Sequence, residues 1–362
     1  MGVLINVLVS AYACHPLRGS EPGVGWTWVR GLAEHCRLDV ITADQFGSRS
    51  AIDAALAADP VLADRLRFHF LPDFDGEAWA RHPFLMKYYQ PLYYRYYRRW
   101  MWSAYELAQR LVAEQRFDLV HQLTMIGYRE PGYLWQLPLP YVWGPVGGTQ
   151  NVPWSFIPSL GWVEGGRHVS RNLINLLQYR MHRRFHRALR RTDALITTAS
   201  DTRRAILRRF GRDSTVIPAS FAMPEHPAAR VRQRDPDAPL RLVVCGMHVS
   251  LKGFPLALRT LARWGKGRSW RVDIIGAGVM TEAWKQEAAK LGVSDHLTWH
   301  GQQTREDSLR IMNSADAMLF TSLKEGSPAV IVEALSLGLP VLTTNHHGMA
   351  DYIDETCGVL LS

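Results

Sequence analysis

Short apolar runs alternate with helical periodicity along almost the whole chain. In the first part the strand-like runs are LINVLVSAY, RLDVITA, RLRFHFLP, DLVHQLT, YVWGPV and ALITTA, and helical stretches such as 24–35 and 101–116 separate most of them. Such runs predict strands, and their alternation with helices predicts βαβ units and a parallel sheet. The opening MGVLINVLVSAYACHP lacks a basic leader and a small-residue cleavage site, so it predicts a first buried strand rather than a signal peptide.

The alternation breaks once, at residues 222–239. This stretch, AMPEHPAARVRQRDPDAP, holds four prolines and many charges, which is typical of a linker. Strand-like runs then return as LRLVVCG, WRVDIIGAG, HLTWHG, DAMLFTS and GLPVLTT. We therefore predict an α/β protein with two doubly wound, Rossmann-like parallel-sheet domains at 1–222 and 240–362, joined by a linker at 223–239. The two domains are expected to face each other across a ligand-binding cleft.

The amino-acid composition further narrows the class of protein. The 362 residues are 47% hydrophobic and 21% charged, which fits a globular protein and excludes global disorder. The four cysteines lie far apart with no CxxC pair, so we expect free thiols in a reducing compartment rather than a disulfide scaffold. Residues 131–163 carry no charge, but six prolines interrupt them, which argues against a membrane-spanning helix.

The net charge of +9 lies entirely within residues 1–222, because residues 223–362 are balanced. Residues 84–102 hold nine aromatic side chains and four cations, and 167–191 hold eight arginines and three histidines, with no acid in either stretch. This pattern suits an anionic membrane surface and predicts peripheral binding to the inner face of the cytoplasmic membrane. One alternative is a solvated basic helix that packs its tyrosines inward. RNA binding is a third, but no nucleic-acid-binding motif accompanies the charge.

Three loops that follow predicted strands resemble phosphate-binding turns: 15–26, 246–253 and 324–334. Glycines let a backbone approach a ligand, and a helix N-terminus offers free N–H groups. Lys252 can neutralise a leaving diphosphate. Ser327 is expected as an N-cap, with Pro328 as the first helical residue. The alternatives are an ordinary strand-to-helix turn, a solvated lysine and a carboxylate that merely favours the helix dipole.

The spacing of glycines and acidic residues argues against a dinucleotide-binding site. Gly276-Ala277-Gly278 follows a predicted strand, but no third glycine stands at the required place and no acidic residue follows in the expected pattern. Hydride transfer is therefore not the predicted chemistry. The histidines also do not converge with cysteines or acids in a metal-binding motif, so we predict no metal site.

The second half of the chain resembles retaining glycosyltransferase family 4, which has the GT-B fold. The matching order is VVCGMHVSLKG, VDIIGAG, LTWHGQ, SADAMLFTSLKEGSPAVIVEALSLGLPVLTTNHHG and GVLLS, with the Glu-x7-Glu signature at Glu325 and Glu333. The match spans nearly all of 240–362. The first domain is similar more loosely, through SEPGVGW, FDLVHQLT and WGPVGG, and looks like the bacterial branch that builds surface polysaccharides.

The resemblance implies a metal-independent hexosyltransferase. Its donor is a nucleotide-diphosphate sugar, and its acceptor is a hydroxyl of a growing glycan, such as an exopolysaccharide precursor linked to polyprenyl diphosphate. Glu325 would hold the donor hexose, helped by the amides of Gly326 and Ser327, while Lys252 binds the diphosphate and Glu333 the ribose. The other implied contacts are Gly23 and Gly25 near the diphosphate, Gly276, Gly278, Gly301 and Gln302 beside the base, His121 near the transferred sugar, and Gly147 and Gly148 in the same cleft.

The chain departs from the family pattern in three places. His248 stands where an arginine commonly helps the diphosphate lysine, and a neutral histidine supplies less charge to the donor site. Leu123 replaces a frequent second histidine, so a core role for His121 stays open. Relatives continue into helices beyond the position of Ser362, which leaves open a truncated chain or a different closure. Two rival functions remain: a catalytically silent nucleotide-sugar-binding subunit, and another GT-B enzyme such as a sugar-nucleotide epimerase.

Overall fold

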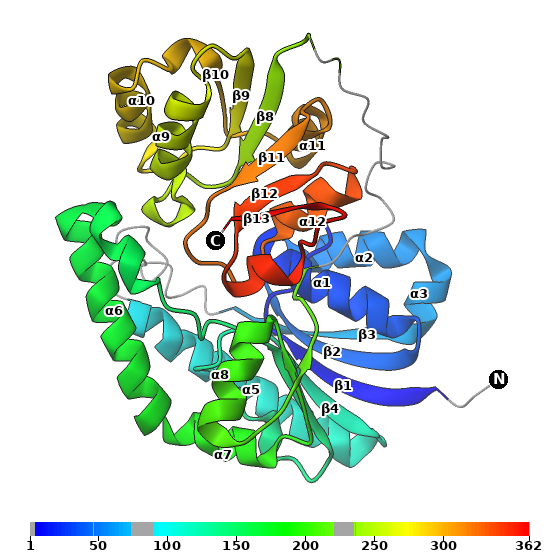
Figure 1. The fold of residues 1–362 in the computed structure, drawn as a ribbon. Helices are drawn as coiled ribbons and strands as arrows, with labels where there is room; N and C mark the ends of the chain where they lie inside the picture. The colour runs from blue at the N-terminus through cyan, green and yellow to red at the C-terminus, as the bar shows by residue number, and fades with distance from the viewer. Residues whose placement is uncertain (1–3, 46, 74–89, 221–234, 236, 362) are drawn as a thin grey trace. The chain divides into compact units, whose positions relative to one another are not determined.

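The computed structural model describes residues 4–45, 47–73, 90–220, 235 and 237–361 (Figure 1). The chain forms two compact units. Unit 1 comprises 1–149, 181–198 and 202–219, and unit 2 comprises 150–180, 199–201 and 220–362. The two units were expected from the single break in the alternation of strands and helices. Most of the predicted linker at 223–239 lies outside the described residues.

Residues 150–180 differ from the prediction, because they group with unit 2 although the sequence analysis assigned them to the first domain. Contacts between side chains of this segment and the rest of unit 2 explain the difference. Ser250 of unit 2 donates its hydroxyl to Glu164 at 3.2 Å. Phe156 also packs its ring against that of His346, with centroids 5.8 Å apart. Contacts of this kind are made by side chains far apart in sequence, and no local pattern announces them.

Unit 1 is built on a seven-stranded sheet in the order β3-β2-β1-β4-β5-β6-β7, in which every paired strand is parallel. The order reverses beside β1, as in doubly wound folds. Its elements are β1 (Ile5–Ala11), α1 (Ser20–Ala33), β2 (Cys36–Asp44), α2 (Ser48–Ala58), α3 (Pro60–Arg65), β3 (Leu66–Pro72), α5 (Gln90–Glu114), β4 (Leu119–Thr124), η2 (Leu134–Gln136), β5 (Tyr141–Val146), α7 (Arg183–Arg191), β6 (Ala194–Thr197), most of α8 (Ser200–Phe210) and β7 (Thr215–Val216).

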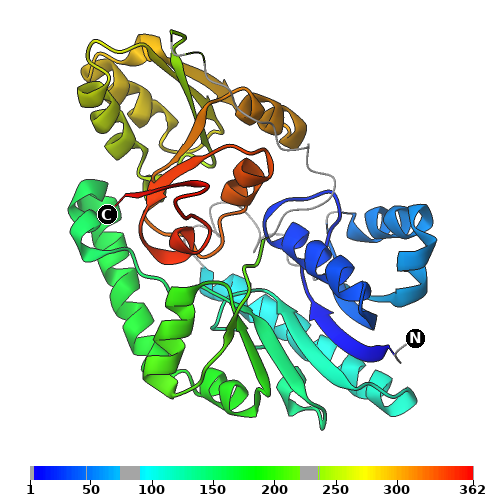
Figure 2. The same cartoon turned by 45° about the vertical axis from the view of Figure 1, so that its right-hand side comes forward.

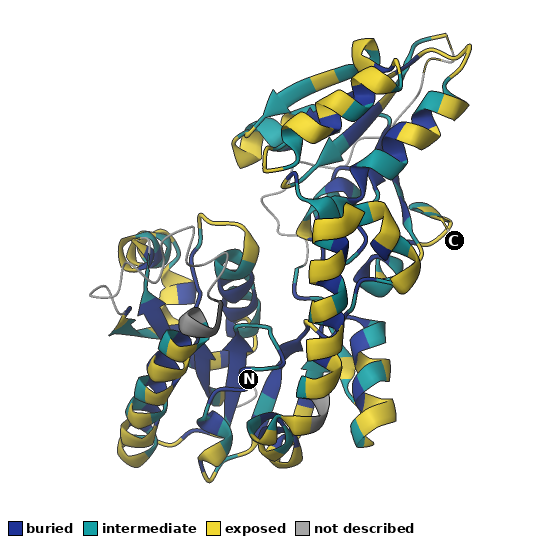
Figure 3. Cartoon of the chain, turned by 90° about the vertical axis from the view of Figure 1, so that its left-hand side faces the viewer, coloured by how far each residue is buried: buried dark blue, intermediate teal, exposed yellow. Residues whose placement is uncertain are grey.

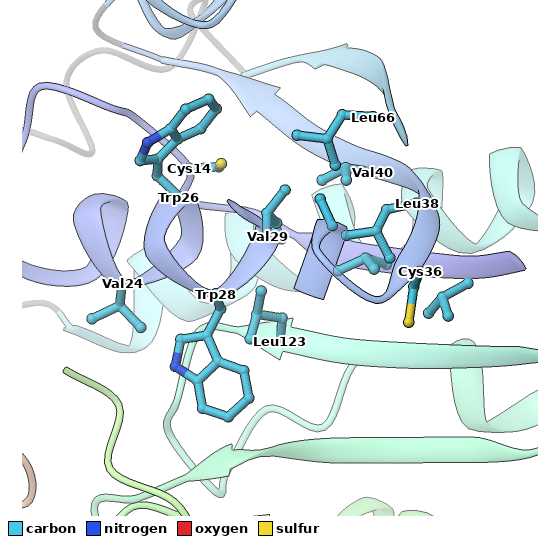
Figure 4. Packing of buried hydrophobic residues seen from close by; sticks show 14 of the residues in the cluster. Cys14, Val24, Trp26, Trp28, Val29, Cys36, Leu38, Val40, Leu66 and Leu123 are labelled. Carbon is cyan, nitrogen blue, oxygen red and sulfur yellow. The ribbon is translucent and has the colours of Figure 1, made fainter. Parts of the chain in front are cut away.

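The core of unit 1 forms where α1 lies on the sheet (Figure 4). Val7, Val9 and Ala11 of β1 are buried, and Trp28 and Val29 of α1 pack in the same cluster. The Trp28 indole Nε1 donates to the carbonyl of Ala219 at 3.0 Å, so its one polar group is satisfied inside the core.

Helix α1 begins at Ser20, four residues earlier than the predicted stretch 24–35. Gly23 and Gly25 therefore lie inside the helix and not in a loop before it. A Cβ atom on Gly25 would lie 2.0 Å from the carbonyl oxygen of Ala13, and one on Gly23 would lie 2.3 Å from that of Arg18. Both glycines allow the helix to lie directly against the loop that precedes it, which is a packing role.

Unit 2 contains a six-stranded sheet in the order β10-β9-β8-β11-β12-β13, again with parallel pairs (Figure 2). Its elements are η3 (Trp154–Leu160), α6 (Gly161–Met181), β8 (Leu240–Cys245), η4 (Ser250–Lys252), α9 (Phe254–Trp264), β9 (Trp270–Ile275), α10 (Thr281–Lys290), η5 (Ser294–His296), β10 (Leu297–Gly301), α11 (Arg305–Asn313), β11 (Ala317–Phe320), α12 (Ala329–Ser336), β12 (Val341–Thr344), η6 (His347–Asp351) and β13 (Gly358–Leu361).

Helices cover both faces of the second sheet. Alternate residues of β11 point to opposite faces, so Met318 joins one buried cluster while Leu319 joins another. The first cluster also contains residues of α11 and α12, such as Met312 and Ile331, and the second contains residues of α9 and α10. Burial on both faces explains why the strands of this unit read as continuous apolar runs.

The aromatic stretch 84–102 is described only from residue 90, within α5. Tyr97 and Trp100 are buried, and both rings pack edge-on against Tyr12 at 4.8 Å. Trp102 remains 46% exposed. In this part of the stretch, packing follows the inward-facing alternative. None of the helices in the described parts of the chain is long and apolar enough to cross a membrane.

Candidate active site

The loops that leave five strands of unit 2 gather at the carboxyl edge of its sheet. Strand order reverses between β8 and β11, and ligands of doubly wound sheets bind where such a reversal opens the edge. Backbone hydrogen bonds tie the loops together: Gly276 N donates to Gly301 O at 2.8 Å, His248 N to Ala277 O at 3.0 Å, Leu323 N to Leu251 O at 2.7 Å, and Gly348 N to Glu325 O at 3.1 Å.

A charged pair lies at this edge. The Lys252 ammonium lies 2.5 Å from Oε1 of Glu325, and the Ser322 hydroxyl donates to the same oxygen at 3.0 Å. Both charged side chains are about a quarter exposed, at 23% and 24%. The predicted diphosphate-binding lysine and the predicted sugar-binding carboxylate are thus in contact, although 73 residues separate them in sequence.

Glu333 stands inside α12 and is paired with an arginine. Arg305 Nε donates to Oε1 of Glu333 at 3.0 Å, and the Glu333 side chain is 23% exposed. Burial raises the pKa of the Cys245 thiol to about 12, and the negative charge of Glu333 adds to this rise. Cys245 is the last residue of β8, so Glu333 acts electrostatically on the carboxyl end of that strand.

Glycines let the loops of the site pack at backbone distance. A Cβ atom at Gly276, whose φ is +119°, would lie 2.1 Å from the carbonyl oxygen of Gly246. One at Gly278 would lie 2.4 Å from that of His248, and one at Gly348 would lie 1.9 Å from that of Gly326. The predicted glycines Gly276, Gly278 and Gly326 are therefore brought to one edge. Gln302 directly follows Gly301, the last residue of β10, and is exposed.

The side chain of His248 is held by two residues of α10, Thr281 and Trp284. Its side chain is buried, its Nδ1 lies 2.8 Å from the Thr281 hydroxyl, and its ring packs on Trp284 at a centroid distance of 4.7 Å. Burial lowers the pKa of the imidazole, so the ring is neutral at pH 7. The position at which the family resemblance implies an arginine thus places no cation at the predicted diphosphate site.

The predicted N-cap role of Ser327 is wrong. Helix α12 begins at Ala329 after Pro328, and no side chain caps it. The Ser327 hydroxyl instead shares a hydrogen bond with Tyr352 Oη at 2.6 Å and accepts from the backbone N of Ser220 at 3.1 Å. Burial raises the pKa of Tyr352 to about 12, which keeps this phenol protonated. Ser327 therefore fastens its loop and does not close the helix end.

His121 lies in the core of unit 1. Its side chain is 4% exposed, its Nε2 lies 2.7 Å from the carbonyl oxygen of Gly144, and its ring packs edge-on against Trp28. Burial lowers the pKa of His121 to about 4. Of the two roles left open by the sequence, these contacts favour the core role.

Gly147 and Gly148 follow β5 at the carboxyl edge of the sheet of unit 1. Gly147 N donates to the carbonyl of Ile126 at 2.7 Å, and a Cβ atom on it would lie 2.8 Å from the Thr198 hydroxyl. Gly148 has a φ of +79°, a conformation that disfavours other residues. Close packing at one position and a left-handed turn at the other account for these two glycines.

One side chain beside the site was missed from the sequence. His347 directly precedes Gly348, has a φ of +55°, and places Nδ1 2.8 Å from Oδ2 of Asp201, which groups with unit 2. Gln150 donates to the other oxygen of Asp201 at 3.2 Å. The HHG sequence was the available signal. Within the described residues, no group of three or more histidine, cysteine, aspartate or glutamate side chains is arranged to hold a metal ion.

Solved structures share this architecture over almost the whole chain. The apo form of lipopolysaccharide outer core galactosyltransferase WaaB has a TM-score of 0.63 at 15% identity, over 99% of this chain and 86% of that one. WaaG, a glycosyltransferase involved in lipopolysaccharide biosynthesis, has a TM-score of 0.55 at 17% identity, over 98% of this chain and 85% of that one. The chain has the GT-B fold. This confirms the predicted fold class of two parallel-sheet α/β domains.

Sequence comparison adds a family match on the GT-B unit that carries the site. Residues 227–361 match the model of the family Glycosyl transferases group 1. The lipopolysaccharide glucosyltransferase WaaG of Escherichia coli K12 is 40% identical over 76 residues, which cover 21% of this chain and 20% of WaaG. The amylovoran biosynthesis glycosyltransferase AmsK of Erwinia amylovora is 29% identical over 126 residues, covering 32% and 30%. The chain thus spans less than a third of these relatives.

Proposed function

We propose that this protein is a bacterial glycosyltransferase that moves a hexose from a nucleotide-diphosphate sugar to a hydroxyl of a surface glycan, with retention of anomeric configuration. The observation that carries the proposal is the contact of Lys252 with Glu325 among glycine-lined loops, at the point where the strand order of unit 2 reverses. The family match over the same residues and the names of the relatives, which act in lipopolysaccharide and amylovoran synthesis, support it.

In the proposed transfer, each residue at this edge of the sheet has a separate role. The Lys252 ammonium binds the diphosphate and stabilises the negative charge that grows on it as the bond to the anomeric carbon breaks. Glu325 accepts hydrogen bonds from hydroxyls of the hexose, and Glu333 accepts them from the ribose. The acceptor oxygen bonds to the same face of the anomeric carbon that the phosphate leaves, and the departing phosphate takes the hydroxyl proton. Positioning of the acceptor supplies much of the remaining acceleration.

The acceptor in this proposal is a growing glycan linked to polyprenyl diphosphate, such as an exopolysaccharide or lipopolysaccharide precursor. The protein then works from the cytoplasm at the inner face of the cytoplasmic membrane, and the net charge of +9 favours that anionic surface. The cation of the site is Lys252, and transfer is proposed to need no metal. Transfer that continues at full rate after chelation with EDTA is the expected result, and loss of activity restored by added Mg²⁺ contradicts this part of the proposal.

Nucleotide binding tests the donor site directly. The melting temperature is measured with UDP, GDP and ADP for the wild type, Glu333→Ala and a control, Glu287→Ala. The control is closely matched, because Glu287 also stands on a helix, accepts from an arginine Nε at 2.9 Å and is 25% exposed. One nucleotide is expected to stabilise the wild type and the control by about 3 kcal/mol at about a hundred times its Kd. Glu333→Ala should lose most of that stabilisation.

The outcomes separate the candidate functions. Equal stabilisation of both glutamate variants contradicts the role of Glu333. Binding without any transfer from the matching nucleotide sugars favours a catalytically silent subunit. Interconversion of the free nucleotide sugars in the absence of an acceptor favours an epimerase.

A further inference from the structure

Helix α6 (Gly161–Met181) is oriented opposite to an ordinary surface helix. Residues 165, 168, 172 and 175 are buried, and their spacing of three and four residues defines one face. That inward face carries Gly165, His168, Asn172 and Asn175, with no large apolar side chain. A surface helix of a globular protein normally buries its apolar face, so this inversion requires a physical reason.

The inward face is held by polar contacts with the segment just before the helix. Asn172 Nδ2 donates to the carbonyl of Val152 at 2.9 Å, and Asn175 Nδ2 donates to Asn151 Oδ1 at 2.7 Å. Ser250 donates to Glu164 at 3.2 Å near the start of the helix. Buried amides need such partners, and these contacts set which way the helix is turned.

The outward face of α6 is apolar. Figure 3 looks at this side of the molecule, where exposed residues run along a long helix. Trp162 is 99% exposed and Val163 is 83% exposed. The apolar side chains that continue this face are Leu173 at 50%, Ile174 at 50%, Leu176 at 42% and Leu177 at 58%. Large apolar groups thus lie exposed on one side of the helix, at its start and again at 173–177, and exposed apolar groups gathered on one side of a helix are typical of an interaction site.

Arginines lie along the margin of this apolar face. Helical spacing places Arg167 one turn from Val163, and Arg171 one turn from Ile174. The Arg167 side chain is 49% exposed. After Glu164 the helix contains no acidic residue, and the following stretch to residue 191 contains none either. An apolar helix face with cationic margins and an exposed tryptophan matches the chemistry of an anionic lipid surface, where the apolar groups insert and the guanidinium groups meet phosphates.

A second copy of the chain fits this face less well. A two-fold contact brings the same patch against itself, so the arginines of one α6 would approach those of the other. No carboxylate between residues 165 and 180 is available to separate these charges. The charge pattern therefore selects an anionic bilayer over self-association.

We propose that the outward face of α6, formed by Trp162, Val163, Leu173, Ile174, Leu176 and Leu177 with Arg167 and Arg171 at its margin, docks the protein on an anionic lipid bilayer. The proposal locates membrane binding in unit 2, whereas Tyr97 of α5, in the aromatic stretch of unit 1, packs inward. It rests on the proposed function only for the reason to visit a membrane, namely a lipid-linked acceptor.

Cosedimentation of the full chain with vesicles tests the proposal. Vesicles of phosphatidylcholine mixed with phosphatidylglycerol are compared with pure phosphatidylcholine at low and high salt. The variant Leu173→Ser with Leu177→Ser should bind the anionic vesicles about tenfold more weakly or worse. Its control is Val61→Ser with Leu207→Ser, which removes two apolar side chains that are 69% and 41% exposed elsewhere, and which should bind like the wild type. Arg167→Gln with Arg171→Gln should weaken binding and flatten its salt dependence.

Each outcome has a defined meaning. Equal vesicle binding by the α6 variant and its control overturns the proposal, as does an absence of binding by the wild type. A wild type that self-associates in light scattering, with dissociation by the Leu173 and Leu177 changes and no vesicle binding, overturns it in favour of a protein interface. Nucleotide-dependent stabilisation is measured on every variant. If it persists while vesicle binding is lost, the fold and the donor site are intact, so this proposal and the proposed function can fail separately.

Discussion

At the residue scale, Lys252 is the cation that we propose binds the diphosphate, because the neighbouring His248 is buried and neutral. Its ammonium is fixed by Glu325 and lies over the glycine at 246, where a Cβ atom would approach Cε to 3.4 Å. In the proposed transfer, this charge would stabilise the negative charge that develops on the leaving diphosphate.

Lys252→Gln should therefore lower kcat by about a hundredfold to a thousandfold, since it removes one preorganised electrostatic group. Lys266→Gln is the control, because Lys266 is exposed and lies between α9 and β9, at the opposite edge of the sheet. Steady-state transfer from the donor sugar found in the nucleotide screen gives the rates. Equal rates for the two variants would exclude Lys252 from the chemical step.

The buried His121 leads to a prediction about how the free energy of unfolding depends on pH. Its pKa is about 4 in the folded protein against 6.5 for an exposed histidine, so the unfolded chain binds the proton more readily. Its contribution to stability is complete above pH 6.5 and is lost as the pH falls toward 4, by about 3 kcal/mol. His121→Gln cannot be protonated, so its free energy of unfolding should fall less than that of the wild type over this range. Denaturant titrations at pH 7 and pH 4 measure the difference, and parallel pH profiles contradict it.

At the scale of elements, the strands were the most predictable features and side-chain directions the least. Continuous apolar runs such as LRLVVCG predict β8 within one residue, because a strand buried on both faces needs apolar residues throughout. The two-residue strand β7 is too short to leave a pattern. The direction of His248 depends on Trp284 and Thr281, which come from elsewhere in the chain, and no local periodicity reports such packing.

The loops of the site were predictable as a set because each follows a strand of a parallel sheet, and the carboxyl ends of such strands meet at one edge. Glu325 and Glu333 were found through the family resemblance, which includes the Glu-x7-Glu signature, and their arrangement with Lys252 and Arg305 follows from the topology. His347 was missed because its contact with Asp201 joins residues 146 apart in sequence.

Gly348 tests the packing of two of these loops. A Cβ atom there would lie 1.9 Å from a backbone oxygen of Gly326, so Gly348→Ala must push the loop that carries Glu325. We expect a loss of stability of about 1–3 kcal/mol and weaker nucleotide-sugar binding. The control is Gly166→Ala in α6, where a Cβ atom meets nothing within 4 Å, and a gain of about 0.5–1 kcal/mol is expected. Thermal unfolding measures both, and a neutral Gly348→Ala shows that the loops can separate freely.

At the scale of the whole molecule, the division into two units follows the predicted domains except for residues 150–180 and the short segments 199–201 and 220–222. The segment 150–180 precedes the predicted proline-rich linker, and the sequence therefore assigned it to the first domain. Its place in unit 2 is decided by individual polar contacts, such as that between Glu164 and Ser250. Average properties of a segment carry no record of such contacts.

Hydrogen exchange measured along the whole chain should locate the nucleotide-binding site. A bound nucleotide adds hydrogen bonds and removes local opening, so protection should rise in the loops at 246–253, 276–278, 301–302, 321–327 and 345–348. The strands β1 and β2 should exchange as before, because they form the core of unit 1. Protection centred on η2 instead would place the nucleotide outside the proposed edge.

In the ion pair of Lys252 and Glu325, the Glu325 carboxylate competes with an incoming phosphate for the Lys252 ammonium. An entering phosphate must take the ammonium away from a carboxylate that already occupies it at 2.5 Å, and the displaced carboxylate then needs a new donor. Inorganic phosphate or a bare nucleoside diphosphate offers none, whereas a sugar hydroxyl on the same ligand does. We therefore expect a nucleotide sugar, which brings the anion and the hydroxyl together, to bind more tightly than the bare nucleoside diphosphate does.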